Sequence, residues 1–315
     1  MLHIRVTAPT AVCADVVARI RLDPAVANVA VMKDAAVGVR GDLIMFDVAR
    51  EAANPILDSL RSLGVLDAGS IAISESVEVL GATAVTAERR SPGHPSDGVV
   101  WEEVENRARE DARLSWSFLA FLILATLIAG IGRYLDQPIL IIGAMVVGPE
   151  FAPLSAICVA LVRRRRGLLA PASLTLLGGF VIAIVLAFLL WGAANLAGVI
   201  DPQVATSGVQ TDFIVKPDVW SFVIALLAGC AGILSLTSAK SSALVGVFIS
   251  ITTVPAAATI ALTLAVGAWD EAAASAVQLG VNLLGLLVAG VATLAVQHAL
   301  TSRRRRSAPG QGVKR

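Results

Sequence analysis

The sequence predicts an α-helical integral membrane protein with a small α+β domain ahead of its membrane-spanning part. Of its 315 residues, 56% are hydrophobic and only 16% are charged, with a mean hydropathy of +0.78; globular proteins have about 45–50% apolar and about 25% charged residues. Residues 1–113 carry 12 basic and 17 acidic side chains, residues 114–300 carry 7 of each, and residues 301–315 carry 6 basic and no acidic ones. This distribution argues against a soluble protein, a disordered chain and a nucleic-acid-binding domain.

Residues 1–80 have the pattern of a ferredoxin-like cytosolic domain. Apolar and polar residues alternate in the first and last of four short runs, the second run is rich in strand-forming residues and the third follows Gly41. Apolar residues recur at helical spacing in two other segments. We expect strands at Leu2–Val6, Val26–Met32, Leu43–Val48 and Ile71–Val79, and helices near Val12–Ile20 and Ile56–Leu63. The resulting order βαββαβ is that of a split βαβ motif. Residues 81–113 predict a Gly/Pro-rich linker followed by a juxtamembrane helix from Trp101.

Residues 114–302 predict a domain of six membrane spans. A spanning helix needs about 20 mostly apolar residues, and six segments meet this need: Leu114–Gly132, Gln137–Val162, Gly167–Ile200, Val219–Ala239, Ser241–Trp269 and Ala272–Ser302. The third segment is long, and we interpret it as one tilted helix. With six spans, the arginines before the first span, Arg163–Arg166, Lys240 and Arg303–Arg306 fall on one side. The positive-inside rule then places both termini, including the basic tail 303–315, in the cytoplasm.

The six spans resemble two inverted repeats of three helices. Ser117 lies at the start of the first span and Ser221 at the start of the fourth, and Pro149 and Pro255 follow them at almost equal separations. Because a triplet has an odd number of spans, the two halves would have opposite orientations. Inverted repeats with Gly/Pro-interrupted helices at matching positions are typical of secondary transporters. We therefore expect the second and fifth spans to break near their prolines and to face each other.

Glu150 is the most informative single residue, because it lies near the middle of the second predicted span. A carboxylate at this depth costs about 2.5–3.5 kcal/mol to insert, so it predicts a proton- or cation-binding site. The alternatives are a protonated carboxyl group bonded to backbone that the prolines free, or a residue at the membrane surface if the second span is broken. The remaining residues that we expect around the same solute are Gly148, Pro149, Pro153, Thr252, Thr253, Pro255, Gln278 and Asn282. For the polar ones, the alternative is hydrogen bonding between helices.

The sequence gives no indication of an enzyme. The motifs of zinc proteases, serine hydrolases and P-loop proteins do not occur, and the three histidines are scattered. We expect no cofactor, no metal site and no nucleic-acid partner. The runs Arg163–Arg166 and Arg303–Arg306 are topology determinants that could also hold anionic lipid of the bilayer.

The stretches Gly143–Pro153 and Ser241–Pro255 resemble, in order and separation, the two motifs of the prokaryotic domain-of-unknown-function family numbered three-eight-nine. The resemblance covers about residues 114–300 and implies a multi-spanning protein of the inner membrane, without a function. It also implies that the Gly/Pro breaks are shared, whereas Glu150 belongs to a subgroup, because many members have an apolar residue there.

Two functions remain open on these grounds. The first is a transporter or channel for a small solute or ion, centred on Glu150 and the breaks at Pro149, Pro153 and Pro255. The second is a membrane-anchored sensor or assembly protein whose cytosolic domain binds a ligand or oligomerises. We also expect a homo-oligomer, because a small apolar membrane unit is joined to a domain of a type that often serves assembly.

Overall fold

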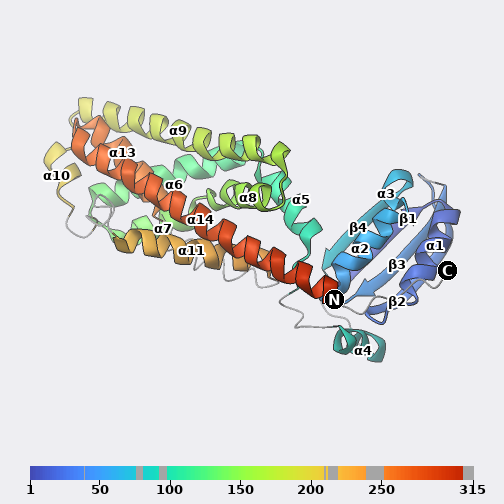
Figure 1. Cartoon of the computed structure of the whole chain (residues 1–315). Helices are drawn as coiled ribbons and strands as arrows, with labels where there is room; N and C mark the ends of the chain where they lie inside the picture. The colour runs from blue at the N-terminus through green and yellow to red at the C-terminus, as the bar shows by residue number, and fades with distance from the viewer. Residues whose placement is uncertain are drawn as a thin grey trace. The chain divides into compact units, whose positions relative to one another are not determined.

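A computed structural model of the chain describes residues 1–38, 40–75, 81–91, 98–208, 211, 219–238 and 252–307, with only the backbone for Glu75 and 302–307. The described residues form two compact units. The first consists essentially of residues 1–103, and the second contains the helices from residue 104 onward (Figure 1). Each unit is considered separately below.

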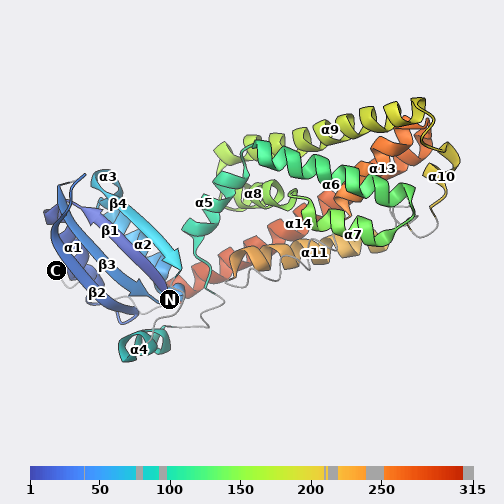
Figure 2. The same ribbon diagram turned by 180° about the vertical axis from the view of Figure 1, so that it is seen from behind.

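The first unit is built on a four-stranded antiparallel sheet. Its strands lie in the order β2-β3-β1-β4 (Figure 2). The strands are β1 (Leu2–Ala8), β2 (Val26–Ala36), β3 (Gly41–Val48) and β4 (Ser70–Glu75), and the helices between them are α1 (Thr10–Ile20), η1 (Arg50–Ala52), α2 (Ala53–Ser62) and α3 (Val65–Ala68). The strands and the two longer helices follow one another in the predicted order βαββαβ.

The alternation in the sequence explains how this sheet forms its core. In β1, Leu2, Ile4 and Val6 are buried, whereas the residues between them face the other side of the sheet, as the two-residue period of a strand requires. The buried residues of β1 and β3 pack with the apolar faces of α1 and α2. Gly64, two residues after the end of α2, adopts a left-handed conformation with φ 73°. A glycine tolerates this conformation without strain, and it stops α2 from continuing.

Two further helices follow the sheet in sequence. The helix α4 (Ala82–Arg90) lies within the stretch expected to be a linker, and it contacts β2. Its Thr83 hydroxyl donates to the Asn28 side chain over 3.1 Å. The helix α5 (Trp101–Asp111) matches the predicted juxtamembrane helix, with Glu102 and Glu103 in its first turn, where acidic side chains interact favourably with the helix dipole.

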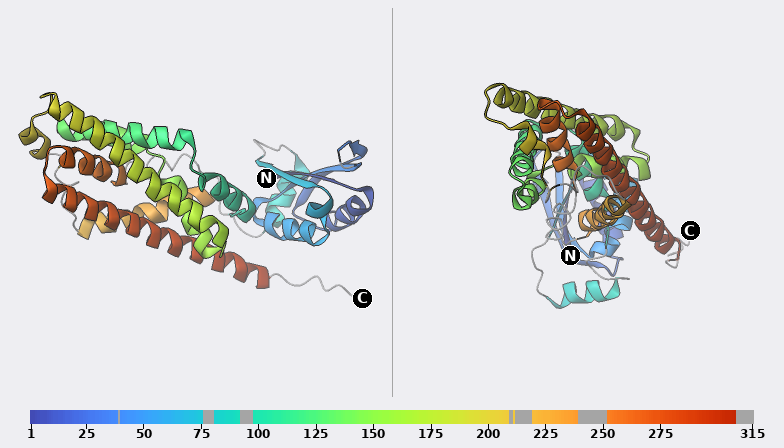
Figure 3. Two further views of the ribbon diagram at one scale, coloured as in Figure 1. Left: turned by 90° about the horizontal axis from the view of Figure 1, so that it is seen from above. Right: turned by 90° about the vertical axis from the view of Figure 1, so that its left-hand side faces the viewer.

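The second unit consists of helices (Figures 1 and 3). Their apolar composition indicates a membrane protein. Four of them are long and apolar enough to cross a bilayer, and a bent pair of helices forms a fifth candidate if the pair is one span. The four are α6 (Trp116–Tyr134), α9 (Arg166–Leu196), α11 (Val219–Thr237) and α14 (Trp269–Ser307); the pair is α7 (Pro138–Val147) and α8 (Phe151–Val162); two shorter helices are α10 (Pro202–Thr206) and α13 (Thr253–Ala265).

The prediction of six spans is therefore not confirmed. The expected fifth span, Ser241–Trp269, lies partly outside the described residues, and α13, its described helical part, has 13 residues, whereas a bilayer requires about 20. The expected third span is one uninterrupted helix, α9, of 31 residues. The expected second span is bent by 50° between α7 and α8, so the prediction that it breaks near its proline is correct.

Small residues allow the long helices to pack closely. A Cβ atom on Gly179 of α9 would lie 2.6 Å from the Phe118 ring of α6. A Cβ atom on Gly285 of α14 would lie 2.8 Å from the Cβ of Ala225 in α11. Real side chains do not approach so closely, so these contacts require glycine; small residues at interfaces are typical of membrane helices because they let the backbones come together.

Candidate functional site

The break between α7 and α8 positions the candidate site. Proline has no backbone N–H and restricts the residue before it to an extended conformation; accordingly Gly148, before Pro149, has φ −63° and ψ 128° and ends α7. A Cβ atom on Gly148 would contact the Glu150 carboxylate and would lie 2.8 Å from Cγ2 of Val254. The break thus packs directly against the beginning of α13.

Glu150 is held at this break with one carboxylate oxygen occupied. It is 4% exposed and lies between α7 and α8, immediately before the first residue of α8. The Thr253 hydroxyl donates to Oε1 of Glu150 over 2.6 Å. The second oxygen, Oε2, is buried and has no hydrogen-bond partner among the described residues. A buried polar atom without a partner is costly, so Oε2 is available to bind a proton or a ligand.

A second hydrogen bond joins α13 to α14 beside the first one. The Asn282 amide donates to the Thr252 hydroxyl over 2.6 Å, and Thr252 precedes the first residue of α13. The hydroxyls of Thr252 and Thr253 are therefore engaged by α14 and by the α7–α8 break, respectively. The start of α13 is a junction between these elements.

Pro255 is the third residue of α13, where the missing N–H would have had no intrahelical partner. The expected break of the fifth span near this proline involves residues 239–251, which lie outside the described residues, so it stays a prediction. The carbonyl of Pro149 accepts from Ala152 N over 3.2 Å, so one carbonyl near the first break is occupied rather than free for a solute. Pro153 is likewise in the first turn of α8 and is buried. The prolines shape the site, and its polar atoms come from other residues.

Further unpartnered polar atoms lie on the face of α14 that carries Asn282. Gln278, one turn before Asn282, is buried, and its Oε1 has no partner in the part of the chain that the structure describes. The same holds for the hydroxyl of Ser275, which the sequence analysis missed. Positions 275, 278 and 282 are spaced at three and four residues, which places them on one face of a helix; this spacing was the available signal.

The helix ends add a favourable electrostatic environment for an anionic carboxylate. The N-termini of both α8 and α13 begin beside the Glu150–Thr253 hydrogen bond. Helix N-termini carry a partial positive charge, which stabilises a carboxylate there. The described residues contain no group of three or more His, Cys, Asp or Glu that could hold a metal ion.

Arg133 forms a separate polar cluster that the sequence analysis did not single out. It is 1% exposed near the end of α6. Its Nη1 donates to the Gly208 carbonyl over 2.9 Å and to the Thr211 hydroxyl over 2.6 Å, and its Nη2 lies 3.7 Å from Glu271 at the start of α14. Arg133 therefore fastens the segment after α10 to two long helices.

The region containing the break and the polar face of α14 can be compared with known proteins. Residues 145–288 match the family described as Domain of unknown function (DUF389). The match includes Glu150, Thr252, Thr253, Gln278 and Asn282, and it confirms the family resemblance of the two Gly/Pro motifs. The family has no assigned function.

The chain is also similar to a curated archaeal protein. An uncharacterized protein of Methanocaldococcus jannaschii is 28% identical over 193 residues, which are 61% of this chain and 58% of the relative. The chain thus matches less than two thirds of that relative's length. No solved structure matches the chain.

Proposed function

We propose that the protein transports a small solute or ion across a membrane, and that Glu150 binds the proton or cation on which transport depends. The observation that carries this proposal is a buried carboxylate at a helix break, with Oε1 bonded to Thr253 and Oε2 without a described partner. Ionisable groups inside membrane segments are costly, and they commonly mark the paths of ions and protons.

The chemistry of the surrounding atoms suits a proton or a hard cation. Oxygen atoms are the ligands that such cations prefer, and Glu150 Oε2 has no described partner at the break. The helix α14, which bonds to Thr252 beside the break, carries two further oxygen atoms without described partners, Gln278 Oε1 and the Ser275 hydroxyl. Interrupted helices with polar side chains between them are also a feature of transporter binding sites. The Thr253 and Asn282 hydrogen bonds would keep the break and α14 in a fixed relation around a bound ion.

The proposal includes an inverted repeat of two three-span halves, and the packing of the long helices supports it. Phe118 of α6 contacts Gly179 of α9, and Phe222 of α11 contacts Gly285 of α14, with the Phe222 ring 3.4 Å from a Cβ on Gly285. The separation in sequence between Pro149 and Gly179 equals that between Pro255 and Gly285. The same kind of residue pair thus joins the first and third helices of each half at equivalent positions.

The same proposal places the protein in the cytoplasmic membrane of a prokaryote with both termini in the cytoplasm. It rests on the basic residues that precede α6, lie between α8 and α9 and follow α14, because positive charges accumulate in cytoplasmic loops. The archaeal origin of the relative is consistent with this placement.

Ion flux in proteoliposomes tests the proposal directly. The native chain is compared with Glu150→Gln under an imposed pH gradient and under gradients of Na⁺ or K⁺. Ser155→Ala is a matched control, since Ser155 is buried in α8 and, among the described residues, bonds only to Ala152 of its own helix, over 2.8 Å. We expect flux in the native chain and in the control and its loss in Glu150→Gln.

The outcomes of this experiment separate the two functional hypotheses. Equal flux in the native chain and in Glu150→Gln would remove Glu150 from the mechanism. No flux in any of the three proteins under any gradient would count against ion transport and favour the sensor hypothesis, which ligand screens on the cytosolic unit would then examine. Circular dichroism and monodispersity of Glu150→Gln confirm that the variant is folded.

A further inference from the structure

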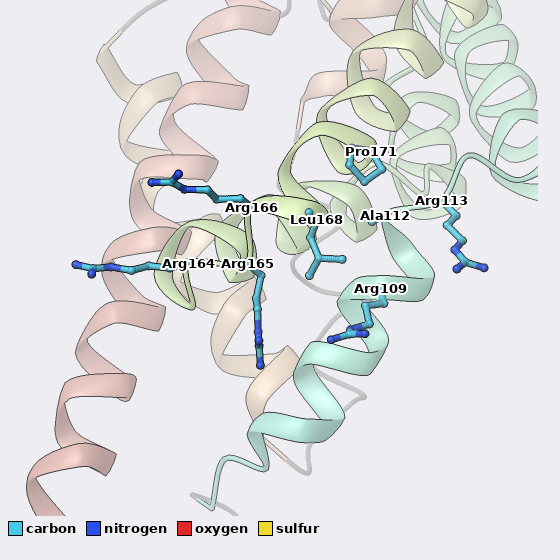
Figure 4. Close-up of a pocket in the computed structure, with 9 residues that line it drawn as sticks. Arg109, Ala112, Arg113, Arg164, Arg165, Arg166, Leu168 and Pro171 are labelled. Atoms are coloured by element: carbon cyan, nitrogen blue, oxygen red, sulfur yellow. The ribbon is translucent and has the colours of Figure 1, made fainter. Parts of the chain in front are cut away.

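A pocket lined by arginine side chains lies between α5 and the beginning of α9, and it shares no lining residue with the helix break (Figure 4). Its volume is about 590 Å³. The lining residues are Arg109, Ala112 and Arg113 from the α5 segment, and Arg164, Arg165, Arg166, Gly167, Leu168 and Pro171 from the turn and first residues of α9. All of these belong to the same compact unit.

The two walls of this pocket are fastened to each other. Glu105 of α5 is buried and accepts hydrogen bonds from Arg163 Nε over 2.8 Å and from Arg165 Nε over 3.0 Å. On the other side, the Thr175 hydroxyl of α9 donates to the Ala112 carbonyl over 2.9 Å. These contacts fix α5 against α9, so the pocket is formed before any ligand binds.

The pocket has an excess of positive charge. Glu105 is engaged with Arg163 and Arg165, whereas Arg109, Arg113, Arg164 and Arg166 are exposed and form no ion pair among the described residues. Arg109 and Arg165 extend toward the same space beneath Leu168, while Arg164 and Arg166 extend away from α5 (Figure 4). Guanidinium groups match the geometry of phosphate oxygens and bind them with paired hydrogen bonds.

The rest of the lining is apolar and continues toward the start of a candidate span. Ala112, Leu168 and Pro171 contribute carbon atoms to the pocket, and Trp116, 84% exposed, begins α6 a few residues after Arg113. Tryptophan at the end of a spanning helix is typical of the membrane interface. The pocket therefore combines cationic groups with an apolar side, and it lies close in sequence to the start of a candidate span, where we expect lipid headgroups.

We propose that this pocket binds a phosphate-bearing anion. Because Ala112, Leu168 and Pro171 form an apolar side of the pocket, we assign an anionic phospholipid headgroup as its ligand. Arg109 contacts the phosphate together with Nη1 of Arg165, because Nε and Nη2 of Arg165 face Glu105. This site is independent of the proposed transport function, since no residue of the pocket belongs to the Glu150 site.

Native mass spectrometry of the purified full-length chain tests this assignment. Phosphatidylglycerol, phosphatidylcholine and soluble glycerol phosphate are each titrated against the native chain, Arg109→Gln and the control Arg107→Gln. Arg107 is exposed on the same helix and does not line the pocket, so it reports the loss of one positive charge near the surface. We expect Arg109→Gln to weaken phosphatidylglycerol binding about fivefold or more, with the control near the native value.

Each result decides the proposal in one direction. Tighter binding of phosphatidylglycerol than of phosphatidylcholine, dependent on Arg109 and absent with glycerol phosphate, supports a lipid site. Arg109-dependent binding of glycerol phosphate at the same strength supports the phosphate site but overturns the assignment of lipid as its source. Equal losses in Arg109→Gln and Arg107→Gln overturn the proposal, because they show diffuse electrostatic attraction instead of a site.

Discussion

The hydrogen bond between Thr253 and Glu150 makes a quantitative prediction about the coupling of α13 to the helix break. The oxygen atoms are 2.6 Å apart and both side chains are buried, a separation typical of a hydroxyl donating to a carboxylate. Hydrogen bonds to charged groups contribute about 1.5–3 kcal/mol. We therefore expect a coupling free energy of about 1.5–3 kcal/mol between these two residues.

A double-mutant cycle measures this coupling. The free energy of unfolding in detergent micelles is determined for the native chain, Thr253→Val, Glu150→Met and the double variant. A control cycle combines Thr259→Val, in place of Thr253→Val, with Glu150→Met. Thr259 lies on the same helix, and its hydroxyl donates to the carbonyl of Pro255 over 2.9 Å. The control should be additive. A Thr253–Glu150 coupling below about 0.5 kcal/mol would refute the reasoning, because it would show that the two groups do not stabilise each other.

Two other predictions concern packing and pH. Gly179→Ala and Gly285→Ala should each destabilise the protein by about 1–3 kcal/mol through overpacking. The control Gly280→Ala, with open space around its Cβ, should not. Thermal unfolding in micelles measures these effects, and equal effects at all three positions would contradict the packing argument. Despite its burial, the pKa of Glu105 is lowered by its hydrogen bonds to Arg163 and Arg165, so its stabilising contribution is present above the unfolded-state pKa and is lost as the pH falls through the lower folded-state value. Hydrogen exchange of α5 should therefore accelerate on acidification in the native chain and show a weaker pH dependence in Glu105→Gln; identical pH profiles would show that this carboxylate does not anchor the helix.

Periodicity was sufficient to predict the sheet unit but not the number of spans. Strand and helix positions in residues 1–75 follow from the spacing of apolar residues, which is two residues in strands and three or four in helices, because one face of each element is buried in a single core. Hydropathy alone gives no such constraint in the membrane unit. The segment from 241 to 269 carries no charge, but the structure describes it only from residue 252 onward, where α13 has 13 residues. Hydropathy reports the environment of a residue and not whether the helix is continuous, so a fifth span in this segment stays a prediction.

The candidate site was predictable where backbone chemistry dominates. The break at Pro149 follows from the absent N–H and the restriction on Gly148, and the burial of Glu150 follows from its apolar surroundings. The pairing of Glu150 with Thr253 and of Asn282 with Thr252 could not be predicted, because it depends on how helices far apart in sequence pack. Burial of Arg133 was missed for the same reason: its partners Gly208 and Thr211 lie beyond α9 in the sequence.

The distance in sequence between the two groups of the central hydrogen bond has a consequence for biosynthesis. Thr253 is 103 residues after Glu150, and chains are synthesised from the N-terminus. The segment of α7 and α8 is therefore complete before its hydroxyl donor has been made. The carboxylate would enter the bilayer alone at a cost of about 2.5–3.5 kcal/mol, so the first half of the membrane unit gains its final arrangement only when the second half arrives from the ribosome.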